Sequence, residues 1–334
     1  MKTTPIRLSL REYVDGILQN NTVVLSKAIT LIESQHKDDK VIATQLIEEI
    51  LPFTGKTTRI AISGSPGAGK SSLIEVLGNF LIEKKEKKVA VLAIDPSSQN
   101  TKGSILGDKT RMQMLSKNKN AYVRPSPAGQ LLGGVAAHTR ETILLCEAAG
   151  YDIVLIETVG VGQSETKARS MVDFFLVLIL AGAGDELQGI KRGIIEVADL
   201  LAITKSDGKN IEHALQAKKA YENALHLYSL PESNWSCPVC TCSALSHEGI
   251  DVIWNYVEQY KILTSKNGFW NKNRQIQQIA WLHEIIDSQL KIDFLENTQI
   301  NQLLPLIEQE VVNGVKSPLE AGFYLLQKFL KNKI

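Results

Sequence analysis

One short stretch near residue 64 constrains the fold more than any other part of this 334-residue chain. Residues 64–71 read GSPGAGKS, which is the spacing G-x-x-x-x-G-K-S, with the β-branched run RIAIS before it and an apolar stretch of helical length after it. A glycine-rich turn between a strand and a helix points its backbone N–H groups inward, where they surround phosphate oxygens. The helix N-terminus adds the positive end of its dipole. The stretch therefore predicts a binding site for a nucleoside triphosphate.

Individual residues of this loop have expected roles. Lys70 should reach the β- and γ-phosphates, and the Ser71 hydroxyl should ligate Mg²⁺. The nucleotide contacts that we expect from the loop as a whole involve Gly64, Gly67, Ala68, Gly69, Lys70, Ser71 and Ser72.

Strand-like and helix-like segments alternate from residue 56 to residue 262. The expected strands are the apolar runs RIAIS, VAVLAI, AYVR, YDIVLIE, DFFLVLIL, DLLAIT and CPVCTCS. The expected helices lie near residues 70–84, 109–117, 136–149, 188–197, 209–228 and 249–261. This alternation predicts an α/β fold with a mostly parallel sheet covered by helices. Together with the motif at residues 64–71 it indicates the P-loop NTPase type. Such sheets bind ligands beyond the carboxyl ends of their strands.

Helical regions flank this domain on both sides. Apolar residues recur at three-to-four spacing in residues 1–55, which we expect to form an N-terminal helical region. After residue 263 the strands stop, and helices are expected at 271–291, 297–313 and 317–331, forming a C-terminal helical region over 263–334. In its first helix a packed stripe is predicted from Ile276, Ile279, Ala280, Leu282 and Ile286.

Composition excludes several classes of function. Lys and Arg total 37 against 36 Asp and Glu, so the net charge of +1 offers no broad basic field for a nucleic acid. The longest apolar run, residues 174–184, is shorter than the roughly 20 residues of a membrane span. Four cysteines make no disulfide framework, and the N-terminus lacks the pattern of a secretory signal. We therefore expect a cytoplasmic protein that binds neither nucleic acid nor membrane.

The sequence TKSD, residues 204–207, follows a predicted strand and points to guanine. Asp207 can accept hydrogen bonds from guanine N1–H and the exocyclic amine, and a carboxylate left unpaired there rejects adenine. The Lys205 stem would cover one face of the base. Thr204 stands where Asn is usual, so it keeps a hydroxyl but loses the amide. The alternative is a charged strand-to-helix turn; the guanine interpretation gains weight from a second loop match one strand later, at Ser243, Ala244 and Leu245.

Acidic residues at other strand ends are candidates for the metal and the hydrolytic water. Glu157 ends a predicted strand, and Gly160 follows it with an N–H suited to the γ-phosphate. Asp95 and Asp108 are candidates for approaching Mg²⁺ or orienting the attacking water. Each has a structural alternative: Asp95 as a turn residue before Pro96, and Asp108 as a helix N-cap.

Two further segments have both a functional and a purely structural interpretation. Residues 182–191 contain glycines and the charged residues Asp185 and Lys191, which suits either a nucleotide-sensing switch or an ordinary loop. The cysteines at 237, 240 and 242 are expected to pack in the core, because no second Cys/His pair of suitable spacing lies near them.

The motifs together resemble one family of proteins. GSPGAGKSS, DPSS, GSILGDKTRM, ETVGVGQSE, GDELQGIK and SALSHEGI occur here in the order seen in the MeaB/ArgK family, P-loop GTPases of the SIMIBI class. The resemblance covers nearly the whole chain. It implies GTP hydrolysis with Mg²⁺, the phosphate and metal roles given above for Lys70, Ser71, Asp95, Asp108 and Glu157, and guanine binding by Lys205 and Asp207. It also implies that Asp185 and Lys191 lie on a switch.

The resemblance further implies a partner, an adenosylcobalamin-dependent methylmalonyl-CoA mutase or a related acyl-CoA mutase, and a homodimer formed through residues 263–334. The first hypothesis is thus a slow GTPase that acts as a chaperone, gating cofactor loading or protection of the mutase. Slow hydrolysis fits the lack of a Gln directly after Gly160, with Gln163 two residues further on. The second hypothesis is an ATPase or kinase that acts on a lysine/arginine/ornithine transport protein. A metal-inserting GTPase is disfavoured because His- or Cys-rich segments are absent from the sequence.

Overall fold

The computed structural model describes residues 7–34, 36–95, 112–127, 138–158, 164–181, 196–226 and 229–331. The chain divides into two compact units, Met1–Arg274 and Gln275–Ile334. Among the described residues, no helix combines the length and apolar character that crossing a membrane requires.

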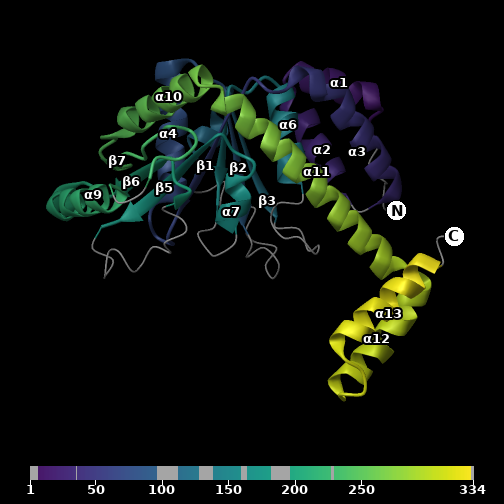
Figure 1. Ribbon diagram of the computed structural model, residues 1–334. Helices are drawn as coiled ribbons and strands as arrows, with labels where there is room; N and C mark the ends of the chain where they lie inside the picture. Colours follow the sequence, from purple (N-terminus) through teal and green to yellow (C-terminus); the bar gives the residue numbers. More distant parts are fainter. Residues whose placement is uncertain are drawn as a thin grey trace. The chain divides into compact units, whose positions relative to one another are not determined.

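A sheet of seven parallel strands forms the centre of the first unit (Figure 1), in the order β3-β2-β4-β1-β5-β6-β7. The strands are β1 Thr58–Gly64, β2 Val89–Asp95, β3 Ala121–Pro127, β4 Ile153–Glu157, β5 Phe174–Leu180, β6 Leu200–Thr204 and β7 Val239–Thr241. Each predicted strand corresponds to one of these. The near-continuous apolar runs are explained by helices on both faces of the sheet, and the predicted α/β fold with a parallel sheet is confirmed.

The outer edge of the sheet at β3 is protected by its sequence. The carbonyl of Asn120 points toward β2, where it accepts from Val89 N. Because backbone groups alternate sides along a strand, Pro125 and Pro127 lie at outward-facing positions, where an N–H would otherwise be unpaired. Proline at such positions blunts pairing with another strand.

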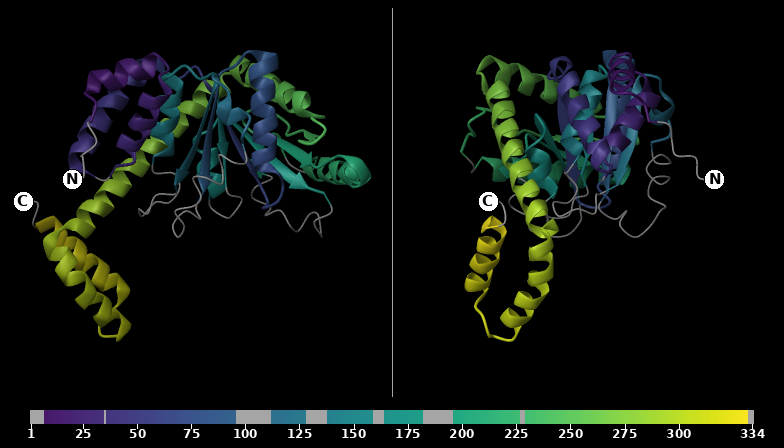
Figure 2. Two further views of the ribbon diagram at one scale, coloured as in Figure 1. Left: turned by 180° about the vertical axis from the view of Figure 1, so that it is seen from behind. Right: turned by 90° about the vertical axis from the view of Figure 1, so that its right-hand side faces the viewer.

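The main hydrophobic core lies between the sheet and two helices, α4 Lys70–Lys85 and α10 Ile250–Lys266. Leu73 and Leu77 of α4, together with Ile253 and Val257 of α10, are fully or almost fully buried against alternate residues of the strands. The opposite face of the sheet carries α6 Thr139–Ala148 and α7 Ser164–Arg169, and Figures 1 and 2 show α7 and α4 on opposite sides. Helix α9 Ile211–Leu225 packs beside β6 and β7.

The N-terminal region is helical, as predicted. It contains α1 Leu10–Leu18, α2 Thr22–Ile32, α3 Lys37–Ile50 and the 3₁₀ turn η1 Leu51–Phe53, and all three helices contact α6. Two of the helix starts follow from side-chain caps. Ser9 and Glu12 form a reciprocal capping box at α1, and the Asn21 side chain accepts from two backbone amides of α2.

Three helices make up the C-terminal part, α11 Phe269–Glu296, α12 Thr298–Val312 and α13 Pro318–Lys331. Helix α11 begins in the first unit and continues into the second. The second unit has a small core of its own, formed by Ile300, Ile307, Ala321, Leu325 and Phe329.

Two details of the predicted pattern are wrong. The expected helix at 109–117 is, in its described part, a turn followed by the 3₁₀ helix η3 Leu115–Lys117. The expected packed stripe on α11 is exposed instead, with Ile276 at 50%, Ile279 at 59% and Leu282 at 55% of full exposure. The apolar periodicity of α11 is therefore not explained by packing within one chain.

Candidate nucleotide site

The motifs that sequence reasoning selected converge on one edge of the sheet. All strand pairs are parallel, so the carboxyl ends of β1, β4, β6 and β7 meet at the same edge. The phosphate loop leaves β1, Glu157 ends β4, and the 204–207 stretch leaves β6. This is where parallel α/β sheets bind ligands.

The phosphate loop has a backbone that only glycine tolerates at its first position. Gly64 has a φ of +150°, and a Cβ there would lie 2.5 Å from the carbonyl oxygen of Leu178. Gly67 and Gly69 have φ values of +84° and +88°, in the left-handed region. Helix α4 begins at Lys70, directly after Gly69, so its first amides face the same loop. Such a loop can hold the oxygens of a phosphate chain.

The Lys70 side chain folds back over this loop. Its Nζ donates to the carbonyl oxygens of Gly64 at 2.8 Å and Ser65 at 3.2 Å. The ammonium group is thereby held next to the loop amides, where it can neutralise phosphate charge.

Ser71 and Glu157 meet at the end of β4, although they are far apart in the sequence. The Ser71 Oγ donates to Glu157 Oε1 at 2.8 Å. A hydroxyl and a carboxylate oxygen are the hard ligands that Mg²⁺ prefers, usually with phosphate oxygens and waters in the remaining positions. The donor set formed by the Ser71 hydroxyl and the Glu157 carboxylate therefore fits Mg²⁺.

The strand end that should read the base is held from two neighbouring strands. Thr204 is buried, and its Oγ1 donates to the carbonyl of Ile179 in β5 at 3.1 Å. Ser206 N donates to the carbonyl of Cys242, just after β7, at 3.1 Å. The hydroxyl that Thr204 retains is thus used to fix the strand end to β5.

Asp207 is oriented by the second loop match. The Ser243 hydroxyl donates to Asp207 Oδ2, and the same Ser243 oxygen accepts from the amides of Leu245 and Ser246 at 3.1 Å each. Asp207 is partly exposed, and Leu245 is 84% exposed. Ala244 lies between Ser243 and Leu245 in this turn. The carboxylate is thereby fixed at the sheet edge with its other oxygen available to a base.

Some predicted residues lie outside the described residues. Asp108, Gly160, Gln163, Asp185 and Lys191 belong to this group. Asp95 is described only as the last residue of β2, at the same sheet edge as the phosphate loop.

Two of the three cysteines predicted to pack in the core do so, and Cys237 is only partly buried. Cys240 and Cys242 are buried in the main core, and burial raises the pKa of the Cys242 thiol to about 12. A thiol with such a pKa stays protonated at neutral pH and is a poor metal ligand or nucleophile. In the described part of the chain, no group of three or more His, Cys, Asp or Glu residues is arranged to hold a metal.

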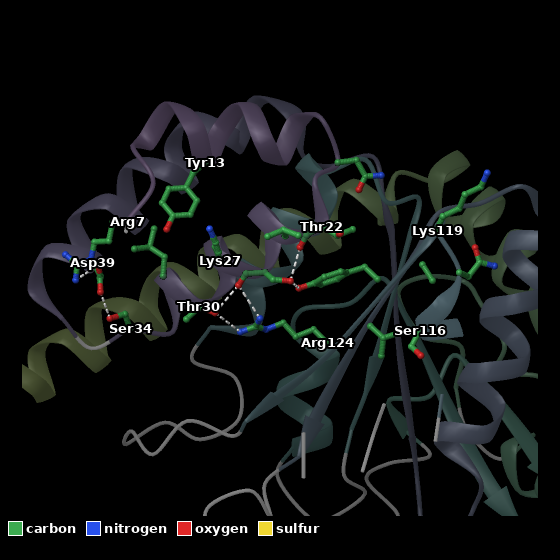
Figure 3. A pocket seen from close by; sticks show the side chains of 18 residues that line it. Arg7, Tyr13, Thr22, Lys27, Thr30, Ser34, Asp39, Ser116, Lys119 and Arg124 are labelled. Carbon is green, nitrogen blue, oxygen red and sulfur yellow. Dashed lines mark hydrogen bonds and ion pairs between the residues drawn. The ribbon is translucent and has the colours of Figure 1, made fainter. Parts of the chain in front are cut away.

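A groove of about 1250 Å³ lies elsewhere in the first unit, between the N-terminal helices and β3 (Figure 3). Two of its charged residues, Arg7 and Asp39, form an ion pair at 3.0 Å. A third, Arg124, binds Glu33 at 2.7 Å and reaches Thr30, which attaches helix α2 to the edge strand. No sequence motif leads to this groove.

Comparisons with known proteins agree with the motifs. The family model described as Methylmalonyl Co-A mutase-associated GTPase MeaB matches residues 25–299. GTPase ArgK of Escherichia coli is 42% identical over 325 residues, which cover 97% of this chain and 98% of that relative. The mouse protein named Methylmalonic aciduria type A homolog, mitochondrial, is 43% identical over 324 residues, covering 94% of this chain and 78% of that relative. A crystal structure of an LAO/AO transport system kinase matches with a TM-score of 0.77 and 36% identity, over 98% of this chain and all of that one.

Proposed function

Since this chain belongs to the MeaB family of methylmalonyl-CoA mutase-associated GTPases, we propose that it is a GTP-dependent chaperone of an adenosylcobalamin-dependent methylmalonyl-CoA mutase or a related acyl-CoA mutase. It gates the loading or protection of the mutase cofactor. The observation that carries this proposal is the family match, which extends over both helical regions as well as the P-loop domain. The convergence of the phosphate loop and the Asp207 loop on one sheet edge supports GTP as the nucleotide.

Hydrolysis transfers the γ-phosphoryl group of GTP to water. Water attacks the γ-phosphorus, the bond to the β–γ bridging oxygen breaks, and GDP leaves with the electrons of that bond. The loop amides and Lys70 stabilise the charge on the phosphate oxygens. Mg²⁺ held near Ser71 and Glu157 would neutralise further phosphate charge. Asp95, Asp108 and Gln163 are the candidates for orienting the water, and Gly160 for binding the γ-phosphate.

The nucleotide state is passed to the partner through segments next to the γ-phosphate. We assign this role to the stretch that contains Asp185 and Lys191, which follows β5 in the sequence. In GTPases such segments are ordered by the γ-phosphate and released on hydrolysis. The mutase would bind one of the two states more tightly and so change the rate of GTP turnover.

We expect the mutase and GTP to affect each other's binding. The affinity of the chain for the mutase should differ by about 5-fold or more between a non-hydrolysable GTP analogue and GDP, the lower end of typical couplings between sites. Calorimetry measures the affinities, and phosphate release measures GTP turnover with and without the mutase. The Lys70→Met variant lacks the phosphate-binding ammonium. It should show neither the affinity difference between the two nucleotides nor the change in GTP turnover with the mutase. Equal affinities and an unchanged turnover rate would remove the chaperone role.

We also propose that the chain forms a homodimer through its C-terminal region. The apolar residues on α11 recur every three to four positions and are largely exposed: Ile276, Ile279, Leu282, Ile286 and Leu290. Exposed apolar surface of this extent is typical of a protein–protein interface. In a two-fold dimer the same stripe of a second copy would pack against it, because a two-fold interface brings the same surface of both chains together.

Light scattering tests the dimer directly. The intact protein should have twice the chain mass of 36.9 kDa. Placing charges on the stripe, as in the double variant Ile279→Glu/Leu282→Glu, should give a monomer because two carboxylates are buried without partners. Lys291→Glu, on an exposed position of the same helix, should remain dimeric. A monomeric intact protein at micromolar concentration contradicts the proposal.

The alternative is an ATPase or kinase acting on a transport protein. The name of the LAO/AO transport system kinase structure is the observation in its favour. This alternative function requires ATP. Asp207 is the residue that should decide between adenine and guanine.

A further inference from the structure

The residues that should contact guanine belong to a short loop with an unusual backbone. Lys205 has a φ of +55°, in the left-handed region that residues other than Gly, Asn and Asp rarely adopt. A conformation of this kind persists only where neighbouring groups fix it. The Lys205 side chain is exposed at the sheet edge, so its own packing does not provide that fixation.

The usual Asn at the first position of this loop would bring a side-chain amide to the site. Thr204 brings only a hydroxyl, and that hydroxyl is turned toward β5, where it donates to Ile179. The described contacts of Thr204 therefore do not reach the Lys205 carbonyl. Another group has to hold the peptide that follows Lys205.

Asn210 provides this contact. Its Nδ2 donates to the Lys205 carbonyl at 2.8 Å, and its backbone N donates to the Asp207 carbonyl at 3.0 Å. One residue thus binds the main chain of both residues that should contact the base.

The use that Asn210 makes of its side chain is informative. Asn210 is the last residue of the 3₁₀ turn η5 Gly208–Asn210, and α9 begins directly after it. Its φ of −92° and ψ of −4° continue the helical turn, and its side chain makes no cap bond to the amides of α9. The side chain is turned to the loop instead, which indicates a local role in the nucleotide site.

We propose that Asn210 is a positioning residue for guanine, and that its amide replaces the one lost at Thr204 by holding Lys205 in its left-handed conformation. The Lys205 stem then lies over the base while Asp207 reads its edge. This inference rests on the proposed placement of guanine against Lys205 and Asp207.

The decisive variants separate the loop from the start of the helix. Asn210→Asp keeps the size and shape of the side chain and is favourable near the positive helix N-terminus, but it removes the donor to the Lys205 carbonyl. Asn210→Ala removes the same donor without adding a charge. Glu212→Gln, in the exposed first turn of α9, is the matched control, because it weakens the helix start without a described contact to the loop.

The expected result is a selective loss of base binding. In titrations with a fluorescent GDP analogue, Asn210→Asp and Asn210→Ala should each weaken binding about 10-fold, the effect of one lost hydrogen bond to a constrained group. Turnover at saturating GTP should stay within about twofold, because the loop does not touch the γ-phosphate. Glu212→Gln should bind GDP as the intact protein does. If Asn210→Asp binds like the intact protein, Asn210 serves the helix alone and the inference is wrong.

A double-variant cycle tests the stated cause. Glycine adopts a positive φ without strain, so in a Lys205→Gly background the further change Asn210→Ala should weaken GDP binding less than about twofold. A further loss as large as in the intact protein would show that Asn210 acts by another route and would overturn the proposed role. If guanine does not bind against Asp207 at all, substitution of Asp207 should leave GDP binding unchanged. That result would contradict the proposed function and not only the role of Asn210.

Discussion

Replacing Asp207 by Asn should weaken GTP binding by roughly 100-fold, equivalent to about 3 kcal/mol. The carboxylate can accept hydrogen bonds from both guanine N1–H and the exocyclic amine, and the Asn amide turns one of these acceptors into a donor that opposes the amine. Ser243 already donates to one carboxylate oxygen, so Asp207 is held in place before the base arrives. Xanthosine triphosphate, which has a carbonyl in place of the exocyclic amine, should bind the variant better than GTP does.

The same measurement separates a GTPase from an ATPase. The intact protein should reject ATP, because adenine offers no donors in that arrangement and would leave the Asp207 carboxylate unpaired. Turnover at saturating xanthosine triphosphate should approach that of the intact protein with GTP, since the phosphate loop is unchanged. If ATP and GTP bind the intact protein equally and Asp207→Asn alters neither, the transport-kinase alternative gains and the guanine site is wrong.

The parallel sheet could be predicted from sequence because its signal is local and strong. In a run such as FFLVLIL every side chain is apolar, so a strand with this sequence has to be covered on both faces. Strand β5 is buried along almost its whole length. The expected helix at 109–117 failed where the signal is weak, since Leu115 is fixed by packing in the core and not by helical periodicity. On α11 the periodicity is real, but sequence alone cannot tell a stripe that packs within the chain from one left exposed.

In the site, too, local features could be predicted from the sequence and contacts between distant residues could not. The phosphate loop is contiguous, so its glycines and Lys70 could be identified from spacing alone. The contact of Ser71 with Glu157 joins residues 86 positions apart and depends on the strand order. Asn210 carried no recognisable signal, because an Asn at the start of a helix is ordinary until its side chain is seen to turn toward the Lys205 carbonyl.

A partly buried arginine near the start of α11, paired with a buried carboxylate, should matter more for stability than an exposed charge. Arg274 makes a two-pronged ion pair with Asp173 at 2.7 Å for each bond, and donates to the carbonyls of Gly55 and Thr57 at 2.5 Å each. Asp173 is 2% exposed. Trp270 lies under the guanidinium, 5.1 Å from ring centre to Cζ. These contacts attach the first turns of α11 to the amino ends of β1 and β5.

Arg274→Met should therefore lower the free energy of unfolding by about 3–5 kcal/mol, since it leaves the Asp173 carboxylate buried without its partner. Lys272→Met, two residues earlier on the same helix, removes an exposed ion pair with Glu232 and should cost at most about 1 kcal/mol. Urea unfolding of the two variants measures the difference. GTP affinity should be unchanged in folded Arg274→Met, because the pair lies at the strand ends opposite the phosphate loop. Equal stabilities of the two variants would mean that α11 is held to the sheet by apolar packing of Trp270 and not by the ion pair.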